Sequence, residues 1–418
     1  MSVEWARNSS LIARDSSLTL ANGARAVLVA RPRSPTFALQ LLVRAGSRHD
    51  GGRPGLAHLV EHLVFRASGE ERPDLFAAVE SLGGEVTATT GRDYTAFSLV
   101  VAAPDALRAL ALLPALARAP ATGPAHVRAE RRIVGHELRE RTRPADALWD
   151  LLLAALWADD PLARPPGGSL AALPRLTVRA AAGFHARHYT APRLLAVAVG
   201  AGADDESFAD SVHAALATLP GDSAEIGTPA SPAAYPAALE APWGGPGCYV
   251  AVGTVVPGVE HADGAALSLL EVVLGQGPGS RLSRALAARG LPAAVQTRYA
   301  AYAGVGVFAA LAAGPFSDAG AITAALEAEV QRLATQPPTP AELRAARRRL
   351  AGALARRCES NAGLASALGV KALFTAPGDT FDGALAAPLS VPLAEVCRVA
   401  TTYLTDATFG RAILRPPG

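Results

Sequence analysis

The sequence lacks both a long apolar run and the features of an export signal. No stretch approaches the ~20 consecutive apolar residues that a helix needs to cross a bilayer. Among the longest, Leu151–Leu156 is bounded by Asp150 and Trp157. The first residues, Met1–Ser17, contain four charged side chains and no apolar core. We therefore expect neither a secretory signal nor a membrane partner.

Cysteine and lysine are also scarce. The three cysteines, Cys248, Cys358 and Cys397, show no CxxC spacing, and an odd number argues against a disulfide framework, which favours a reducing cytoplasm. Lys371 is the only lysine, and we interpret the dominance of arginine as genomic compositional bias. The net charge of +2 gives no reason to expect nucleic acid as a partner.

The chain is long enough for more than one domain. It has 418 residues, and half of them are apolar, whereas domains usually contain roughly 100–200 residues. A segment rich in Pro, Gly and Ser lies near the middle, from Pro220 to Pro242. This segment predicts an N-terminal domain over residues 1–222, a linker over 223–241 and a C-terminal domain over 242–418.

Apolar patterns predict strands and helices in irregular alternation. Leu82–Val101 is typical of a hairpin with its turn at Gly91-Arg92-Asp93. Further strands are expected at residues 26–30, 37–43 and 249–256, and helices at 104–117, 125–142, 148–157 and 340–363. Together they predict an α+β fold with mainly antiparallel sheet packed by helices.

The two halves resemble distant copies of each other. In each half a strand and a polar turn lead into a helix, and the two helices read GLAHLVEHLVF and AALSLLEVVLG. When these are aligned, three positions pair as His58 with Ser268, Glu61 with Glu271, and His62 with Val272. The repeat predicts two homologous domains, of which only the first retains metal-binding side chains.

The segment His58-Leu-Val-Glu-His62 indicates a metal site. Positions i and i+4 of a helix lie one turn apart on the same face, so both imidazoles can bind one ion. Glu61 stays on that face and can accept a proton from a water that the metal activates. The alternative is an ordinary helix in which both histidines have hydrogen-bond partners and the glutamate lies on the surface.

A catalytic zinc site needs a third protein ligand, and the best candidates lie in ERRIVGHE. Glu130 and Glu137 are seven residues apart and project from nearly the same side of a helix. One could bind the metal and the other could orient a ligand or the water, but spacing does not decide which. A solvated charged helix with paired arginines and glutamates fits the same segment.

These motifs together resemble the pitrilysin/insulinase family of inverted zincins, in the branch that contains the mitochondrial processing peptidases. HxxEH is the signature of that family. The resemblance extends through nearly the whole chain, in the segments LTLANGARAVLV, VRAGSRHD, LGGEVTATTGRDYTAF, ERRIVGHE, GFHARHYTAPRLLAVAVG and GPGSRLSRALAARGL. It implies that Glu137 is the third zinc ligand. It also implies that Glu130 takes the place of the family's second acidic residue, which supports the ligands without binding the metal itself.

The resemblance also implies how substrate is bound. In this family four α+β units enclose a chamber, and a chain of this length supplies two of them. Thr87, Ala88 and Thr89 match the edge strand to which a peptide adds as an extra strand, with Thr87 in the usual position of an Asn. Active single-chain relatives also carry an Arg and a Tyr after Ser-Arg-Leu, but the matching positions here hold Leu286 or Ala287 and Ala293.

The expected function is therefore that of a zinc endopeptidase with one Zn²⁺ per chain. Its substrate would be a short unfolded peptide, cleaved inside a chamber with Glu61 as the base. The missing Arg/Tyr pair predicts a homologous non-zinc subunit as partner, and a homodimer is a second possibility. The alternatives are an inactive scaffold or partner subunit of the same fold and, more remotely, a processing enzyme for a ribosomally made precursor.

Overall fold

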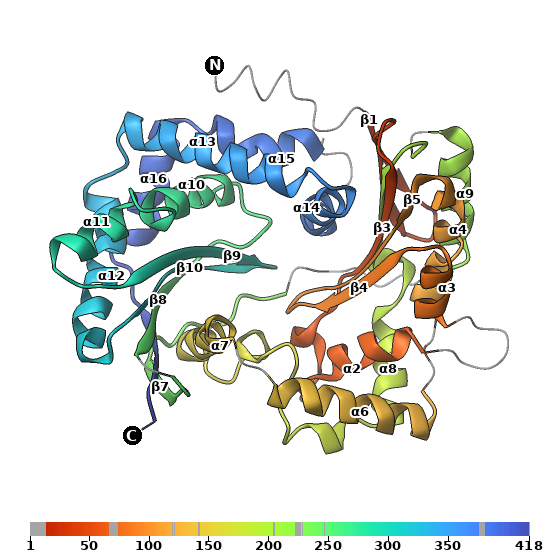
Figure 1. Ribbon diagram of the computed structural model, residues 1–418, viewed down its shortest axis with the longest axis horizontal. Coiled ribbons are helices and arrows are strands. Elements are labelled where there is room, and N and C mark those ends of the chain that lie inside the picture. Colours follow the sequence, from red (N-terminus) through yellow and green to blue (C-terminus); the bar gives the residue numbers. More distant parts are fainter. Residues whose placement is uncertain are drawn as a thin grey trace.

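The computed structural model describes most of the chain. It covers residues 14–66, 74–118, 120, 122–140, 143–203, 205–221, 227, 229–245, 247–375 and 381–417. Two mixed sheets form the centres of two halves that lie side by side (Figure 1). The chain is α+β, with mainly antiparallel pairing in both sheets, as the sequence predicts.

The first sheet has six strands in the order β1-β2-β6-β3-β5-β4. Its strands are β1 (Arg14–Thr19), β2 (Arg25–Ala30), β3 (Thr36–Val43), β4 (Glu85–Thr90), β5 (Thr95–Ala102) and β6 (Leu194–Gly200). The central strand β6 is buried along its whole length because the sheet is covered on both faces, which explains its continuous apolar sequence. Strand β4 lies at the edge and alternates between exposed and half-buried residues.

The first half contains eight described α-helices, and apart from α7 they lie on one side of this sheet. They are α2 (Leu56–Val64), α3 (Leu75–Ser81), α4 (Ala106–Leu110), α5 (Leu113–Ala117), α6 (Pro124–Arg139), α7 (Pro144–Trp157), α8 (Val178–His188) and α9 (Glu206–Ala217). The predicted helix at 104–117 is interrupted between α4 and α5. Pro114 has no N–H to donate to Leu110, so the helix stops and restarts with Pro114 in its first turn.

The second sheet has five strands in the order β7-β11-β8-β10-β9. They are β7 (Ala238–Pro242), β8 (Cys248–Val256), β9 (Ala294–Tyr302), β10 (Val305–Gly314) and β11 (Gly410–Arg415). Strand β7 starts within residues that the sequence assigns to the linker. It pairs with β11 in parallel, so the end of the linker segment is part of this sheet.

Helices of the second half are α10 (Gly264–Gly275), α11 (Arg281–Ala288), α12 (Ala319–Thr335), α13 (Pro340–Arg357), α14 (Asn361–Phe374), α15 (Phe381–Ser390) and α16 (Leu393–Leu404). The predicted helix at 340–363 is two helices. The side chain of Ser360 accepts a hydrogen bond from the N–H of Gly363 and caps the start of α14, a role for which Ser is strongly preferred.

Two helices are exchanged between the halves. Helix α7 packs on β8 and β11 of the second sheet, where Leu152, Leu153 and Leu156 enter a fully buried core. Helix α14 packs on β3 and β6 of the first sheet, where Leu364 and Leu368 are fully buried. Each sheet therefore has one face covered by a helix from the other half.

The short 3-10 helices lie in the connections, at Ser47–His49, Ala103–Asp105, Pro161–Ala163, Leu173–Arg175, Ala191–Arg193 and Phe316–Asp318. Within the described ranges, the helices are all too short or too polar to cross a bilayer.

Candidate metal centre

Helix α2 carries the HxxEH segment, and its start is fixed by Asp50. The Asp50 carboxylate accepts hydrogen bonds from the N–H of Gly55 (2.7 Å) and the N–H of Ala57 (2.8 Å). Burial raises the pKa of Asp50 to about 7, and these backbone N–H groups act in the opposite direction. Gly55 has a positive φ of 91°, and a Cβ there would lie 2.8 Å from the carbonyl oxygen of Gly167. The entry to α2 therefore depends on glycine at this position.

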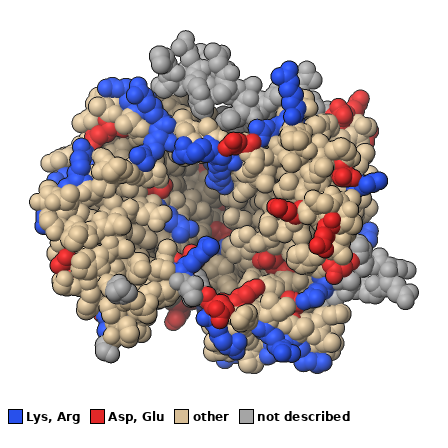
Figure 2. All heavy atoms as spheres, viewed as in Figure 1, with Lys and Arg blue, Asp and Glu red and all other residues tan. Residues whose placement is uncertain are grey.

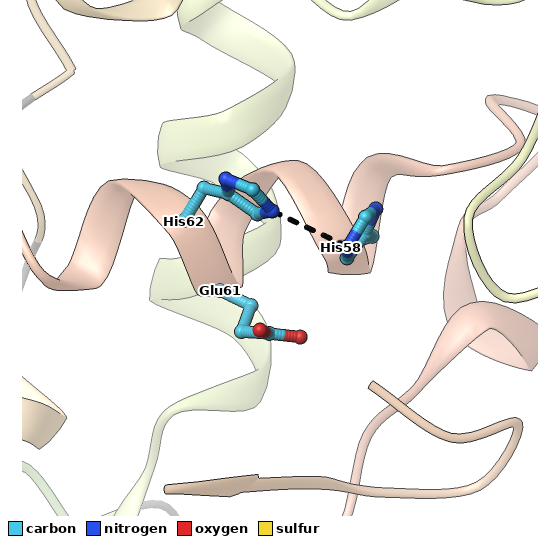
Figure 3. A group of neighbouring side chains, drawn as sticks. All are labelled: His58, Glu61 and His62. Carbon is cyan, nitrogen blue, oxygen red and sulfur yellow. Dashed lines mark hydrogen bonds between the residues drawn. The ribbon is translucent and has the colours of Figure 1, made fainter. Parts of the chain in front are cut away.

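The apolar side of α2 packs into the core, so the opposite side of the helix faces the site. Leu59, Val60 and Leu63 are fully buried in the core beneath the first sheet. Figure 3 shows the imidazoles of His58 and His62 converging from successive turns of the helix, with the Glu61 carboxylate beside them. The sequence period of the helix thus places all three side chains in one group, whose ligand atoms lie within 4.8 Å of one another.

Helix α6 packs against α2 and brings both predicted glutamates to the site. Glu130 is buried; its Oε2 lies 3.1 Å from Nδ1 of His62, and its Oε1 lies 2.5 Å from Nε of Arg66. Glu137 is about half exposed, and its Oε2 lies 3.6 Å from Nε2 of His58 and 3.5 Å from Nε2 of His62. Glu137 therefore faces both Nε2 atoms, and Glu130 faces Nδ1 of one imidazole.

Three acceptor atoms converge at the centre of the site. Nε2 of His58 and Nε2 of His62 are 3.3 Å apart, and Oε2 of Glu137 lies at the two distances given above. If Nδ1 of His62 donates to Glu130, its Nε2 carries a lone pair. A tetrahedral ion with ligands at ~2.0–2.1 Å separates any two ligand atoms by about 3.3–3.4 Å. The observed spacings therefore fit a bound zinc ion.

The protonation state of His58 also suits a metal ligand. Its desolvation by burial lowers its pKa to about 4, and the nearby His62 acts in the same direction. The imidazole is therefore neutral at pH 7, which leaves a lone pair for a cation. Its Nδ1 is buried and has no hydrogen-bond partner among the described residues.

Glu61 is directed into the site by a neighbour that the sequence analysis missed. Its carboxylate is almost completely buried, and its Oε2 accepts a hydrogen bond from the hydroxyl of Thr90. Burial raises the pKa of Glu61, while the Thr90 hydrogen bond and His62 lower it and Glu137 raises it further. Thr90 is adjacent to the predicted substrate strand, but nothing in its spacing indicates contact with the helix. Arg66 and Asp50 were missed for the same reason.

The predicted substrate residues lie at the edge of the first sheet. Thr87, Ala88 and Thr89 belong to β4, which pairs with β5 on one side and lies next to α2. Thr87 and Thr89 are exposed and Ala88 is half-buried. An edge strand beside three acceptor atoms can present backbone groups to an extended peptide.

Comparison with known proteins identifies the family of this chain. Residues 25–168 match the family described as Insulinase (Peptidase family M16), and residues 175–350 match the Peptidase M16 inactive domain. The chain belongs to the insulinase, or M16, peptidase family. An uncharacterised zinc protease of Mycobacterium tuberculosis (strain H37Rv) is 29% identical over 417 residues, which cover 96% of this chain and 93% of that protein.

Two more relatives of this M16 chain show the range of the family. Subunit 1 of the mitochondrial cytochrome b-c1 complex of Bos taurus is 28% identical over 280 residues, which cover 64% of this chain and 58% of that protein. A crystal structure of a protease from Helicobacter pylori superimposes with a TM-score of 0.84 at 23% identity, covering 96% of this chain and 100% of the other. This structural match shows that the chain and the Helicobacter pylori protease share a fold.

In the described part of the second half, no group of side chains corresponds to that of His58, Glu61 and His62. Within α10, Ser268 and Val272 take the places of His58 and His62. Glu271 remains, but its Oε1 accepts a hydrogen bond from Nε2 of Gln276 (3.1 Å). The match of this region to the inactive domain of the family is consistent with the loss of the ligands.

The arginines and tyrosine near the missing Arg/Tyr positions have partners within the chain. Arg289 lies 3.5 Å from Glu329, Arg298 stacks 4.1 Å above the ring of Trp149, and the hydroxyl of Tyr299 donates to the carbonyl of Pro257. Of the two residues that can match the Arg position, Leu286 is buried and Ala287 is exposed.

Proposed function

We propose that this chain is a zinc-dependent endopeptidase with one Zn²⁺ per chain. His58, His62 and Glu137 would hold the metal, Glu61 would act as the base, and Glu130 would orient His62. The observation that carries the proposal is the convergence of three acceptor atoms at 3.3, 3.5 and 3.6 Å, spacings that suit a tetrahedral ion. The zinc proteases among its relatives support the choice of metal.

The chain's own residues would perform the proton transfers. A zinc ion in this site would lower the pKa of a bound water and polarise the scissile carbonyl. Thr90 occupies Oε2 of Glu61, which leaves Oε1 to take a proton from the attacking water. Glu61 would then return that proton to the nitrogen of the leaving amine. The buried surroundings of Glu61 exclude bulk water and strengthen these interactions.

Substrate would bind as an extended chain along β4. Backbone groups of Thr87, Ala88 and Thr89 would pair with the peptide, because β4 is an edge strand. The pairing requires an extended backbone, so short unfolded peptides are the proposed substrates. The test is hydrolysis of an unstructured fluorogenic peptide by the zinc-loaded protein, with a folded protein of similar composition as the negative control.

Chelation and mutation separate this proposal from adventitious activity. We expect 1,10-phenanthroline to abolish cleavage and stoichiometric zinc to restore it. Glu61→Gln should retain zinc and lose cleavage. Cleavage that survives both treatments would overturn the proposal.

We further propose that the chain acts as the metal-bearing subunit of a dimer. The observation that favours this is the absence of the Arg/Tyr pair, together with the internal partners of Arg289, Arg298 and Tyr299. A homologous subunit without zinc would supply the pair; a homodimer is the second arrangement. Activity measured alone and with a homologous chain, alongside sedimentation velocity, tests this. Full activity from a monomer would contradict both arrangements.

An inactive scaffold is the second candidate function. It is favoured by the inactive-domain match over residues 175–350 and by the likeness to a subunit of the cytochrome b-c1 complex. The complete set of His58, Glu61, His62 and Glu137 argues against it. Absence of bound metal after purification in zinc-containing medium, with no effect of Glu61→Gln in any assay, would favour the scaffold.

We also propose the division into a zinc domain at residues 1–222, a linker at 223–241 and a second domain at 242–418. The two sheets support this division, although α7 and α14 cross it. The cytoplasm is the proposed location, since Cys248, Cys358 and Cys397 are free thiols.

A further inference from the structure

A cavity of about 810 Å³ lies in the second half, between α10, β9 and helices α13, α14 and α15. Ser268 and Gly264 of α10 line it, together with Tyr299 and Ala301 of β9. Because Ser268 takes the place of His58, the cavity opens on the side of α10 that corresponds to the metal-binding side of α2. The second half therefore has an open space where the first half has its metal group.

The walls of the cavity are mostly apolar. Leu350 and Leu354 come from α13, Val370 from α14 and Leu385 from α15, and all four are only partly buried in the structure. Leucines that remain accessible inside a concavity are typical of ligand sites, and this volume lies within the roughly 300–1,000 Å³ of small-molecule pockets. The surface thus offers a place for an aliphatic group.

Two cations border the same cavity. Arg357 of α13 and Lys371 of α14 line it, and within the part of the chain that the structure describes neither forms an ion pair. The carboxylate among its described lining residues, that of Glu260, accepts a hydrogen bond from the N–H of Gly304 and lies 3.9 Å from Arg44. Figure 2 shows both Lys or Arg and Asp or Glu side chains around the hollow between the two halves. Among the described lining residues, the charged side chains without an ion-pair partner are therefore Arg357 and Lys371.

The hydroxyl groups of the cavity already donate within the protein. Ser268 donates to the carbonyl of Gly264 (2.9 Å), Tyr299 to Pro257 (3.0 Å) and Thr375 to Lys371 (3.2 Å). A peptide buried here would leave many of its backbone groups without hydrogen-bond partners, which is unfavourable. An aliphatic chain has no such groups, so the walls favour a ligand that is polar at one end only.

We propose that this cavity binds an aliphatic carboxylate, with its chain between the leucines of α13 and α15 and its carboxylate held by Arg357 and Lys371. This site is separate from the metal centre, and binding to it does not depend on peptidase activity. Both cations are hydrogen-bond donors to a carboxylate, and the guanidinium can engage both oxygens.

The test is calorimetric titration of the full chain with decanoate below its micelle concentration, with decanol as the uncharged comparison. We expect one decanoate per chain, bound at least tenfold more tightly than decanol. The double variant Arg357→Gln/Lys371→Gln should weaken decanoate binding about tenfold or more and leave decanol unchanged. Arg348→Gln, an exposed arginine of α13 outside the cavity, is the matched control and should bind like the parent.

A variant that fills the cavity tests the apolar part independently. Leu354→Trp should weaken decanoate and decanol alike, with circular dichroism and the melting temperature reporting that the fold is kept; if it does not fold, the charge variants still decide. Equal affinity for decanoate and decanol, or no loss in the double variant, would overturn the proposal. So would binding of an acetylated leucine-rich tetrapeptide amide in preference to decanoate.

Discussion

Helices α2 and α10 occupy equivalent places in the two halves, each beside an edge strand, yet only α2 carries the candidate metal-binding side chains. In the first half, Glu61 lies beside two imidazoles and accepts a hydrogen bond from Thr90 on β4. In the second half, Glu271 accepts hydrogen bonds from Gln276 and from the backbone N–H of Tyr299 on β9. The two equivalent carboxylates therefore have different partners: that of Glu271 accepts hydrogen bonds from a strand backbone and a glutamine, and that of Glu61 lies beside two imidazoles.

The comparison teaches that a buried glutamate on this helix is not sufficient for a site. Burial raises the pKa of both Glu61 and Glu271. What differs is the neighbours: His58 and His62 supply lone pairs in the first half, whereas Ser268 in the second half donates to its own helix. The side chain of Glu271 accepts a hydrogen bond from the edge strand β9, whereas the edge strand β4 lies beside the group of His58, Glu61 and His62.

The largest expected effect distinguishes the two glutamates. Glu61→Gln should lower kcat by about 10²–10⁴-fold, the usual contribution of a general base, without loss of zinc. Glu271→Gln should change kcat by less than about twofold at pH 7, because Glu271 contacts no metal-binding group. Steady-state hydrolysis of a fluorogenic peptide, with zinc quantified in each preparation, measures both. Equal losses in the two variants would break the comparison.

The next largest effect is expected on the affinity for zinc. Glu130→Gln should weaken zinc binding by about 10–100-fold, because Nδ1 of His62 loses a charged partner. His62→Ala should lose zinc altogether, while Val272→Ala at the corresponding place in α10 should keep it. Competition with a zinc-sensitive dye gives the affinities. Retention of full affinity in Glu130→Gln would show that His62 needs no such partner.

Thr90 should have a smaller effect, on the turnover step alone. Thr90→Val removes the hydroxyl that fixes Oε2 of Glu61, and we expect kcat to fall about tenfold with KM unchanged. Thr90→Ser should restore most of it. Tyr302→Phe, at the same end of β9, removes a hydrogen bond from Trp149 and should leave kcat unchanged. A rise in KM without a fall in kcat would indicate that Thr90 contacts substrate instead.

The smallest effect concerns stability in the second half. Burial raises the pKa of Glu271 to about 7 from its usual 4.5, against the influence of Tyr299, Gln276 and Arg298. Between those values the folded state holds a proton that the unfolded state has released, so the free energy of unfolding should fall as pH rises from 4.5 to 7. Since the side chain is partly accessible, about 1–2 kcal/mol is expected.

The measurement is urea unfolding of the metal-free protein at several pH values, for the parent and Glu271→Gln. The difference between the two curves isolates Glu271, because all other titrating groups are shared. A difference that does not vary over this pH range would mean that Glu271 titrates normally.

The sequence predicted which side chains of α2 lie together better than it predicted their long-range contacts. The helical period placed His58, Glu61 and His62 together because all three lie within two turns of one helix. The contact of Glu130 with His62 crosses 68 residues, and the choice between the two glutamates came from the family resemblance and then from the distances. Spacing could not reveal Thr90 or Arg66, because their partners lie on other elements.

The sequence predicted the α+β class and the repeat of two similar halves, but not the exchange of α7 and α14 between those halves. Helix α7 has apolar residues on most of its faces, which predicts burial but not the sheet that buries it. The break before Pro114 and the cap at Ser360 were both visible as residue types. At both places one helix was predicted and two were found.

The crossing of α7 and α14 has a consequence for synthesis on the ribosome. When the first half has emerged, all strands of its sheet are available, but the face that α14 covers stays bare until residues 361–374 follow. About 160 residues, from the end of β6 to the start of α14, must be made in between. A nascent chain of this protein should therefore depend on holding chaperones for longer than its domain size suggests, and neither half expressed alone should remain in solution without the other.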